Sequence, residues 1–246
     1  MGFQEVQMTK TISAINHEAL LELDGFWAYE IQKYYKNYKV NSVIIAANSK
    51  FRIADIHKNN KTGLDAITFQ DQASGEYVVI YVGTQGGTDI MQDAQLITAM
   101  TPSQYANALA YLKQQPNKIS YVGGNSLGGG LALYAGGIEG VPAVTLNPAP
   151  VPKHMQEVNT QGLSNYIIEN DPLFNAVNGG GLGSQIIGQK IMLEAGLFGS
   201  QMIKNHTGFY VTNKDKGKNN SNEPVKVLYG SNVENKLMCT KRRENI

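Results

Sequence analysis

Several features that mark other classes of protein are missing from this sequence. It contains a single cysteine, Cys239, which excludes an internal disulfide. The net charge is only +1, so we expect neither nucleic acid nor a strongly anionic surface as the main partner. No apolar run is long enough to span a bilayer, and segment 1–5 has neither the basic nor the apolar part of a cleavable export signal. The sequence therefore favours a cytoplasmic protein, or one exported by a route that needs no signal peptide.

The overall composition is that of an ordinary globular domain. With 246 residues, of which 42% are apolar and 17% charged, the chain is long enough for one α/β domain with a sizeable core. We expect a single domain over residues 1–246, in which 1–40 is an N-terminal helical segment. Residues 213–246 are then a C-terminal extension that begins with a solvated run of lysine and asparagine.

The most informative stretch is Tyr121–Leu131, YVGGNSLGGGL. It contains Gly124, Ser126 and Gly128 in the pattern G-x-S-x-G, the nucleophile elbow, in which a serine lies on a sharp turn from strand to helix. The preceding residues 119–122 are typical of a central strand, and good helix formers follow. The alternative, a phosphate-binding loop, lacks the Lys-Ser/Thr pair that a Walker loop requires. We therefore interpret Ser126 as a nucleophile.

The hydrophobic pattern around this stretch predicts alternating helices and strands. Helices are expected over Glu18–Tyr35, Asp89–Met100 and Ser103–Gln115, and strands over 66–69, 77–82, 119–122, 142–147, 165–170, 208–212 and 224–229. The first two strands form an expected hairpin. A helix between successive strands is typical of a mostly parallel sheet. The predicted fold class is therefore α/β, with helices flanking that sheet.

The loop after the strand 77–82, residues 83–88, is flexible and carries hydroxyl groups. In enzymes with a nucleophile elbow, one amide of the oxyanion hole follows the serine, and here it belongs to Leu127. The other amide comes from a loop after an earlier strand. Thr84 is our candidate for this second donor, whereas without the elbow it would be interpreted as a turn-forming threonine.

A triad with an elbow serine is completed in chain order by an acid and then by a histidine. The histidines of the chain are His17, His57, His154 and His206. The first two precede Ser126, and the third leaves only Glu139 as an intervening acid, so His206 is the expected general base. Asp171 is the expected acid because it directly follows an expected strand, and the carboxyl ends of parallel strands share one edge of a sheet. Glu169 is the second choice.

Four motifs occur together in the order found in one known family. They are Val79–Thr84, Gly124–Gly129, Asn170–Leu173 and His206–Gly208. With them the chain resembles the class 3, or fungal-type, lipases and their bacterial relatives over roughly 64–212. Asn125 replaces the usual histidine and Val82 the usual arginine, so the subfamily and the substrate stay open.

The resemblance implies an α/β-hydrolase fold and hydrolysis of acyl esters of lipids without a cofactor or a metal. It also implies a triad of Ser126, Asp171 and His206, with Thr84 and Leu127 at the oxyanion hole. We therefore expect a serine hydrolase of the lipase or phospholipase A type that acts through an acyl-enzyme. The alternatives are a small-molecule esterase or thioesterase, and a non-catalytic binding domain on a hydrolase fold.

The expected partners follow from this activity. The substrate would be a lipid or phospholipid, met in transient contact with a membrane surface, and no nucleic acid is expected. Bacterial relatives of the family include exported effectors that a dedicated protein neutralises. An immunity or chaperone partner is therefore expected if this chain is exported.

The segment 173–203, between the expected acid and the expected base, is rich in glycine and then in apolar residues. It predicts an amphipathic helix hinged on glycines. Two interpretations of that helix are equally open: a lid or acyl-chain channel beside the active site, and a core helix with a flexible entry loop.

Overall fold

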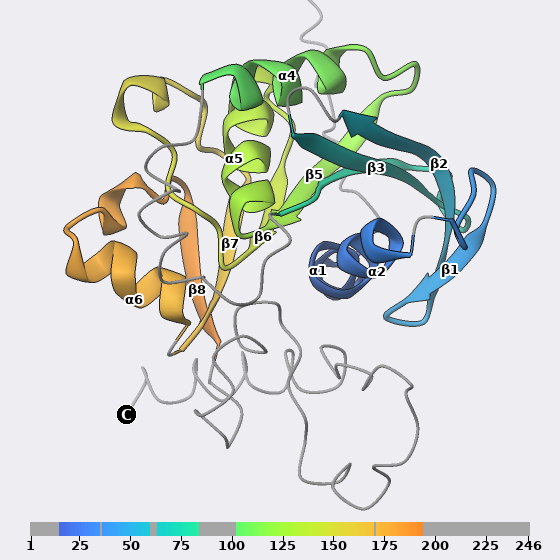
Figure 1. Ribbon diagram of the computed structural model, residues 1–246, viewed down its shortest axis with the longest axis horizontal. Helices are drawn as coiled ribbons and strands as arrows, with labels where there is room; N and C mark the ends of the chain where they lie inside the picture. Colours follow the sequence, from blue (N-terminus) through green and yellow to red (C-terminus); the bar gives the residue numbers. More distant parts are fainter. Residues whose placement is uncertain (1–14, 35, 60–62, 84–101, 170, 194–246) are drawn as a thin grey trace, which may run out of the picture.

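The protein folds around one sheet of eight strands (Figure 1). The structure, a computed structural model, describes residues 15–34, 36–59, 63–83, 102–169 and 171–193. The strands in these ranges are β1 (Val43–Ala46), β2 (Ser49–Asn59), β3 (Leu64–Asp71), β4 (Tyr77–Tyr81), β5 (Ile119–Asn125), β6 (Ala143–Leu146), β7 (Leu163–Ile168) and β8 (Gln189–Leu193). The helices are α1 (His17–Glu22), the π-helical η1 (Leu23–Trp27), α2 (Ala28–Lys33), α4 (Pro102–Lys113), α5 (Leu127–Glu139), η2 (Lys153–Met155), α6 (Pro172–Gly179) and η3 (Gly183–Gln185).

The strands follow one another across the sheet in the order of the sequence. From β1 to β4 neighbouring strands are antiparallel, whereas from β4 to β8 they are parallel. The expected hairpin consists of β3 and β4, and its turn is held by Asp71, whose Oδ2 accepts a hydrogen bond from Ser74 N at 3.0 Å. Parallel strands need crossover connections, and α5 provides the one from β5 to β6. The predicted α/β class is confirmed.

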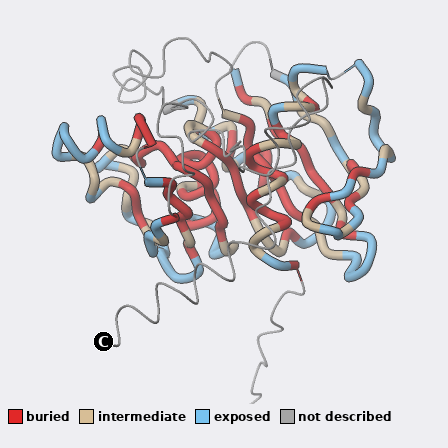
Figure 2. The backbone as a smooth tube through the Cα atoms, turned by 90° about the horizontal axis from the view of Figure 1, so that it is seen from below, coloured by how far each residue is buried: buried red, intermediate tan, exposed pale blue. Residues whose placement is uncertain are grey.

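Helices cover both faces of the sheet. α1, η1 and α2 lie across one face, and α4 and α5 lie on the other (Figure 1). Successive residues of a strand point to opposite faces, so Val144 of β6 packs in the first layer and Ala143 in the second. Figure 2 shows that the buried backbone runs through the middle of the molecule, between exposed loops. The largest fully buried side chains come from both layers and include Tyr81, Tyr105, Phe51, Phe69 and Leu20.

The N-terminal helical run has an irregular middle. The helix expected over 18–35 is observed over 17–33 as α1, η1 and α2. Asn16 caps its start, because Asn16 Oδ1 accepts a hydrogen bond from Ala19 N at 2.8 Å. A π-helical turn holds one residue more than an α-helical turn, and here it contains the buried side chain of Asp24.

Two expected elements have shifted bounds. α4 begins at Pro102, one residue before the expected start at Ser103, and proline is favoured at the first position of a helix. β7 covers Leu163–Ile168 rather than 165–170, because its pairing with β6 starts at its first residue. Asp171 is therefore not the next residue after the strand but lies three positions beyond its last residue, Ile168.

The amphipathic helix predicted to follow the glycines of segment 173–203 is wrong for residues 189–193. Residues 189–193 form β8, which pairs with β7 in parallel. Ile191 and Leu193 pack against the core, whereas the alternate residues are exposed, as expected for the two-residue period of a strand. This two-residue period is not visible in the sequence, because the outward-facing Met192 is also apolar. Neither the lid nor the core helix is therefore observed at these positions.

Other expectations concern residues outside the described ranges. These are the helix over Asp89–Met100, the strands over 208–212 and 224–229, and the extension 213–246. Within the part of the chain that the structure describes, no helix combines the length and the apolar character needed to cross a membrane.

α5 approaches the sheet so closely that main chain meets main chain. A methyl group on Gly128 would overlap the carbonyl oxygen of Tyr81 in β4. One residue later, a methyl group on Gly129 would lie 2.8 Å from Pro148 Cβ. Because no side chain separates the backbones of residue 128 and Tyr81, the helix can start directly against β4 only if residue 128 is glycine.

We predict that Gly128→Ala destabilises the protein strongly. The added methyl group meets main-chain atoms that cannot rotate away, and overpacking of this kind costs about 1–3 kcal/mol or more. Gly179→Ala is the matched control, since a methyl group there meets nothing within 4 Å and alanine favours the last turn of α6. Urea denaturation of both variants checks the prediction. Equal midpoints would show that α5 can withdraw from the sheet without cost.

Candidate active site

The chain turns from β5 into α5 at a single residue, Ser126. Its backbone has φ 56° and ψ −124°, a region that residues with side chains rarely adopt. Ser126 N donates to Leu146 O at 3.2 Å, and Ser126 O accepts from Ala149 N at 2.8 Å. Such a conformation costs about 1–3 kcal/mol and is found mainly at functional sites. The surrounding structure therefore holds this serine in a conformation that it would not adopt alone.

The packing explains the glycines on either side of Ser126. A methyl group on Gly124 would overlap the main chain of Gly128 and lie 2.7 Å from Tyr81 O. The chain that leaves β4 also passes beside the serine, because a methyl group on Gly83 would lie 3.5 Å from Ser126 Cβ. β4, β5 and α5 thus meet around the serine with only backbone between them.

Of the two expected oxyanion-hole residues, Leu127 is described and Thr84 is not. Leu127 is the first residue of α5. The first N–H groups of a helix have no acceptor within the helix, and the positive end of the helix dipole lies there. The amide of Leu127 is therefore suited to an anion forming next to Ser126. Thr84 lies outside the described residues, but Gly83, which precedes it, lies beside the serine.

Asp171 lies at the same edge of the sheet as Ser126. β5, β6 and β7 are parallel neighbours, and each of the two residues follows the carboxyl end of its strand. The side chain of Asp171 is fully buried and caps α6, because Oδ1 accepts a hydrogen bond from Phe174 N at 2.7 Å. A carboxylate has two oxygens, so capping is compatible with a further hydrogen bond. Glu169, the second choice for the acid, is exposed.

The expected base, His206, lies outside the described residues. The described histidines are His17, His57 and His154, and none of them hydrogen bonds to Ser126. His17 Nδ1 instead shares a hydrogen bond of 2.8 Å with Tyr166 Oη, and burial lowers the pKa of His17. None of the three described histidines is therefore hydrogen-bonded to the candidate nucleophile.

The sequence does not reveal the structural role of two asparagines at this edge, Asn125 and Asn147. Asn125 Nδ2 donates to Leu146 O at 3.0 Å, and Asn147 Oδ1 accepts from Ile168 N at 2.8 Å. Each side chain joins the ends of two neighbouring strands, β5 with β6 and β6 with β7. The available signal is an asparagine at the very end of a buried strand, where the chain must leave the sheet and its backbone loses regular partners.

Asp24 is a buried carboxyl group packed against the strand that leads to Ser126. Its side chain is 3% exposed, and neither carboxylate oxygen has a hydrogen-bond partner among the described residues. It faces Gly123 so closely that a methyl group there would overlap Asp24 Oδ1. Burial raises the pKa of Asp24 well above its ordinary value, and the nearby backbone N–H of Gly124 opposes only part of this rise. Ionisation of Asp24 is therefore unfavourable in the folded protein.

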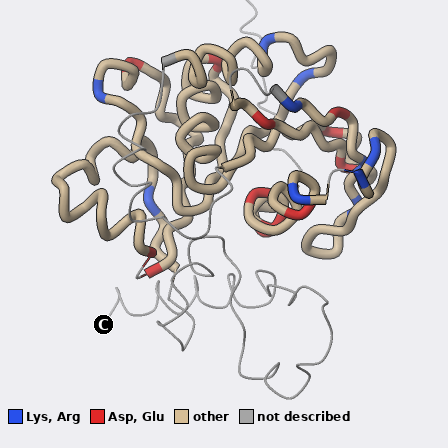
Figure 3. The backbone as a smooth tube through the Cα atoms, viewed as in Figure 1, with Lys and Arg blue, Asp and Glu red and all other residues tan. Residues whose placement is uncertain are grey.

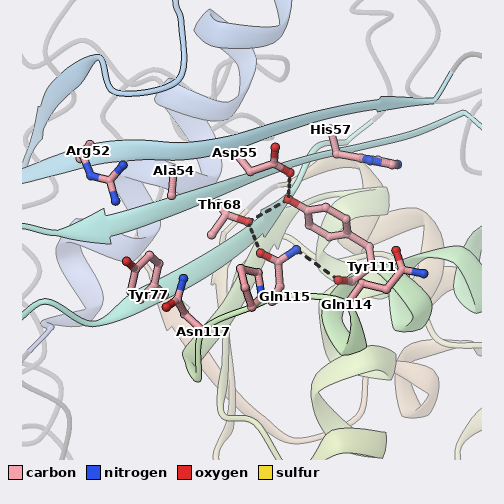
Figure 4. A pocket seen from close by; sticks show the side chains of 11 residues that line it. Arg52, Ala54, Asp55, His57, Thr68, Tyr77, Tyr111, Gln114, Gln115 and Asn117 are labelled. Atoms are coloured by element: carbon pink, nitrogen blue, oxygen red, sulfur yellow. Dashed lines mark hydrogen bonds between the residues drawn. The ribbon is translucent and has the colours of Figure 1, made fainter.

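A polar pocket of about 460 Å³ lies away from this site (Figure 4). Tyr77 begins β4 and Asn117 precedes β5, so the pocket lies at the amino ends of the parallel strands. Its polar groups bind one another: Tyr111 Oη donates to Asp55 Oδ2 and lies 2.8 Å from Thr68 Oγ1. Parallel α/β sheets bind ligands at the carboxyl ends of their strands. The pocket is therefore separate from the candidate active site.

The centre of the sheet carries no charged side chain (Figure 3). β5 and β6 contain no Lys, Arg, Asp or Glu, and in α5 the only such residue is Glu139 at the far end. In the described ranges, no three side chains of His, Cys, Asp or Glu come together to hold a metal ion. Among the described residues, the groups placed to stabilise a negative charge at Ser126 are therefore backbone amides at the N-terminus of α5.

These features define the class of the protein, an α/β domain with a strained serine at the turn from a central strand to a helix. Comparison with protein families identifies the family to which the chain belongs. The phospholipase-like model described as the Tle-like phospholipase domain matches residues 38–186. The chain belongs to this family, which confirms the lipase-like relationship inferred from the sequence.

The chain is also similar to solved structures of fungal lipases. The native propeptide complex of Rhizomucor miehei lipase shares 14% identity at a TM-score of 0.43, over 64% of this chain and 61% of that one. The triacylglycerol lipase of Penicillium expansum shares 11% at 0.44, over 72% and 77%. Lipase II of Rhizopus niveus shares 9% at 0.41, over 73% and 80%. Comparison with curated proteins finds no match.

We predict that Asp24→Asn stabilises the protein at alkaline pH and that the gain fades in acid. The unfolded carboxyl group ionises near pH 4, whereas the folded one keeps its proton to higher pH. The contribution of Asp24 to the free energy of unfolding is therefore complete below about pH 4 and is lost as the pH rises towards the raised pKa. The asparagine variant has no such loss, because its side chain does not ionise. Urea denaturation at pH 8 should favour the variant by about 1–3 kcal/mol. A gain of equal size at pH 4 would contradict the role of ionisation.

Proposed function

We propose that this protein is a serine hydrolase of the phospholipase A type, which cleaves a carboxylic ester of a glycerophospholipid through an acyl-enzyme. Ser126 is the nucleophile, Asp171 and His206 complete the triad, and the amides of Leu127 and Thr84 form the oxyanion hole. The observation that carries the proposal is the backbone of Ser126, with φ 56° at the first turn of α5. A nucleophile elbow uses this strand-to-helix conformation to expose the serine hydroxyl.

The chemistry proceeds in two acyl transfers. Ser126 Oγ attacks the ester carbonyl carbon while His206 takes the hydroxyl proton, and the amides of Leu127 and Thr84 stabilise the oxyanion. The ester C–O bond then breaks, and His206 returns the proton to the departing alcohol. Water attacks the acyl-enzyme in the same way, which releases the fatty acid and restores Ser126. Asp171 orients the imidazole of His206 and stabilises its charged form.

The arrangement of the sheet supports the choice of acid and base. Ser126 and Asp171 follow strands that are two positions apart and parallel, so both residues lie at one edge. The three described histidines do not bond to Ser126. His206 follows β8, the next parallel strand beyond β7, and the chain order of serine, acid and histidine is that of elbow hydrolases.

The choice of substrate has a different basis. The family is described as phospholipase-like, which favours a phospholipid over a triacylglycerol. β5 and β6 contain no charged residue, which suits an acyl chain and its neutral ester better than a charged small molecule. The phospholipid head group would then lie farther from the serine, towards solvent.

We predict that Ser126→Ala abolishes ester hydrolysis, with a fall in kcat of at least about 10³-fold, because no other group can form the acyl-enzyme. Hydrolysis of phosphatidylcholine vesicles and of a triacylglycerol emulsion is measured by fatty acid release. Ser120→Ala is the matched control, since Ser120 lies on the same strand but its hydroxyl donates to Glu76 Oε1 at 2.9 Å.

The same measurement separates the alternatives. Faster release from the emulsion would identify a triacylglycerol lipase, and cleavage of p-nitrophenyl acetate alone would identify a small-molecule esterase. A wild-type protein that neither hydrolyses these esters nor labels with a fluorophosphonate probe would be a binding domain. Labelling that persists in Ser126→Ala would remove this serine from the mechanism.

We predict that Asp171→Asn lowers kcat by about 10²–10⁴-fold with little loss of stability. Asparagine is also a good helix cap and keeps the oxygen that binds Phe174 N, so α6 keeps its start, whereas the charge that orients His206 is lost. Asp171→Ala, which also removes the cap, should cost about 1 kcal/mol more in urea denaturation. Full activity of Asp171→Asn would exclude this carboxylate, and Glu169→Gln would then be the variant to test.

A further inference from the structure

Asn147 is the first residue after β6 and lies between the two strands that lead to Ser126 and Asp171. Its side chain is 1% exposed, and its backbone is left-handed, with φ 43°. Asn147 N donates to Tyr166 O in β7 at 2.8 Å, so the backbone pairing of β6 with β7 continues up to this residue. The left-handed conformation then turns the chain out of the sheet.

At this turn a side chain takes the place of a backbone carbonyl. In a regular parallel ladder, the strand residue whose N–H has just paired offers its own carbonyl to the next N–H of the neighbouring strand. That next N–H belongs to Ile168, the last residue of β7, and it donates to Asn147 Oδ1 at 2.8 Å. The side-chain amide therefore keeps β7 attached after the backbone of β6 has left the sheet.

The consequences of this bond extend to both candidate catalytic residues. On the side of β7, Ile168 O accepts a hydrogen bond from Asp171 N at 3.0 Å, which fixes the turn into α6. On the side of β5, Ala149 N donates to Ser126 O at 2.8 Å. The three residues 147–149 thus bridge the serine turn and the end of β7.

We infer that Asn147 is a positioning residue that sets the place of the Asp171 carboxylate relative to Ser126. The inference rests on the proposed triad. Asn147 touches neither the substrate nor the reacting atoms in this scheme, and acts through Ile168 and the turn that follows it. Two properties are needed at this position: tolerance of a left-handed backbone and a short side chain with a carbonyl oxygen.

Asn147→Gly separates these two properties. Glycine adopts the left-handed conformation without strain but leaves Ile168 N–H without its acceptor. With a short-chain phosphatidylcholine as substrate, we expect kcat to fall by about 10–100-fold and KM to change by less than about twofold, because a shift of about 1 Å in a catalytic group has effects of this size. Ile53→Val, in the core at β2, is the control that loses stability but should keep kcat.

A double-variant cycle distinguishes positioning from a general loss of structure. In an Asp171→Asn background the group to be positioned is no longer charged, so Asn147→Gly should lower kcat by less than about twofold. An equal fall in both backgrounds, or no fall in the wild-type background, would overturn the inference. If Asp171→Asn alone leaves kcat unchanged, the proposed triad fails and the inference fails with it.

Asn147→Asp replaces the glycine variant if that variant does not fold. Aspartate tolerates a left-handed backbone and keeps an oxygen for Ile168 N–H, so kcat per folded molecule should stay within about threefold of the wild type. A larger loss of the same size with and without Asp171→Asn would count against Asn147 as a positioning residue.

Discussion

The contact of the α5 backbone with the backbones of β4 and β5 is the constraint on which the rest of the structure depends. It exists because Gly124 and Gly128 have no side chain, and it forces the chain to reverse within one residue, Ser126. The strained backbone of Ser126 is held by two hydrogen bonds, one to Leu146 O at the end of β6 and one from Ala149 N in the chain that follows. The position of the serine is therefore a property of three strands and a helix rather than of a loop.

Features that depend on neighbouring residues could be predicted from the sequence. The glycines, the serine, the apolar strand before them and the helix after them form one short pattern, and the structure shows the expected turn. Asp171 could be placed at the right edge because an apolar strand precedes it. β8 could not be predicted as a strand. Its inward residues are apolar, but one of its outward residues is apolar too, so the sequence shows neither the period of a strand nor that of a helix.

Features that depend on register between distant segments could not be predicted. Asn147 acquires its role only because β6 and β7 pair so that Ile168 N faces it, across 21 residues of sequence. Asp24 is similar: a charged residue on an amphipathic helix suggests a solvated face, yet the π-helical turn buries it against Gly123. In both cases the sequence shows a polar residue at an apolar position. It does not show which distant residue that side chain contacts.

The order of the strands has a consequence for how the chain assembles. In the described sheet each strand pairs with the one synthesised just before it, so none has to insert between two that are already joined. The hairpins of the amino-terminal half involve short-range contacts and can form early, and they offer β4 as a template edge. The parallel strands can then add one at a time as they leave the ribosome. The serine turn becomes complete only when β6 has docked, because Leu146 O and Ala149 N hold it. A nascent chain that ended at α5 would therefore contain the serine but not the support for its strained backbone.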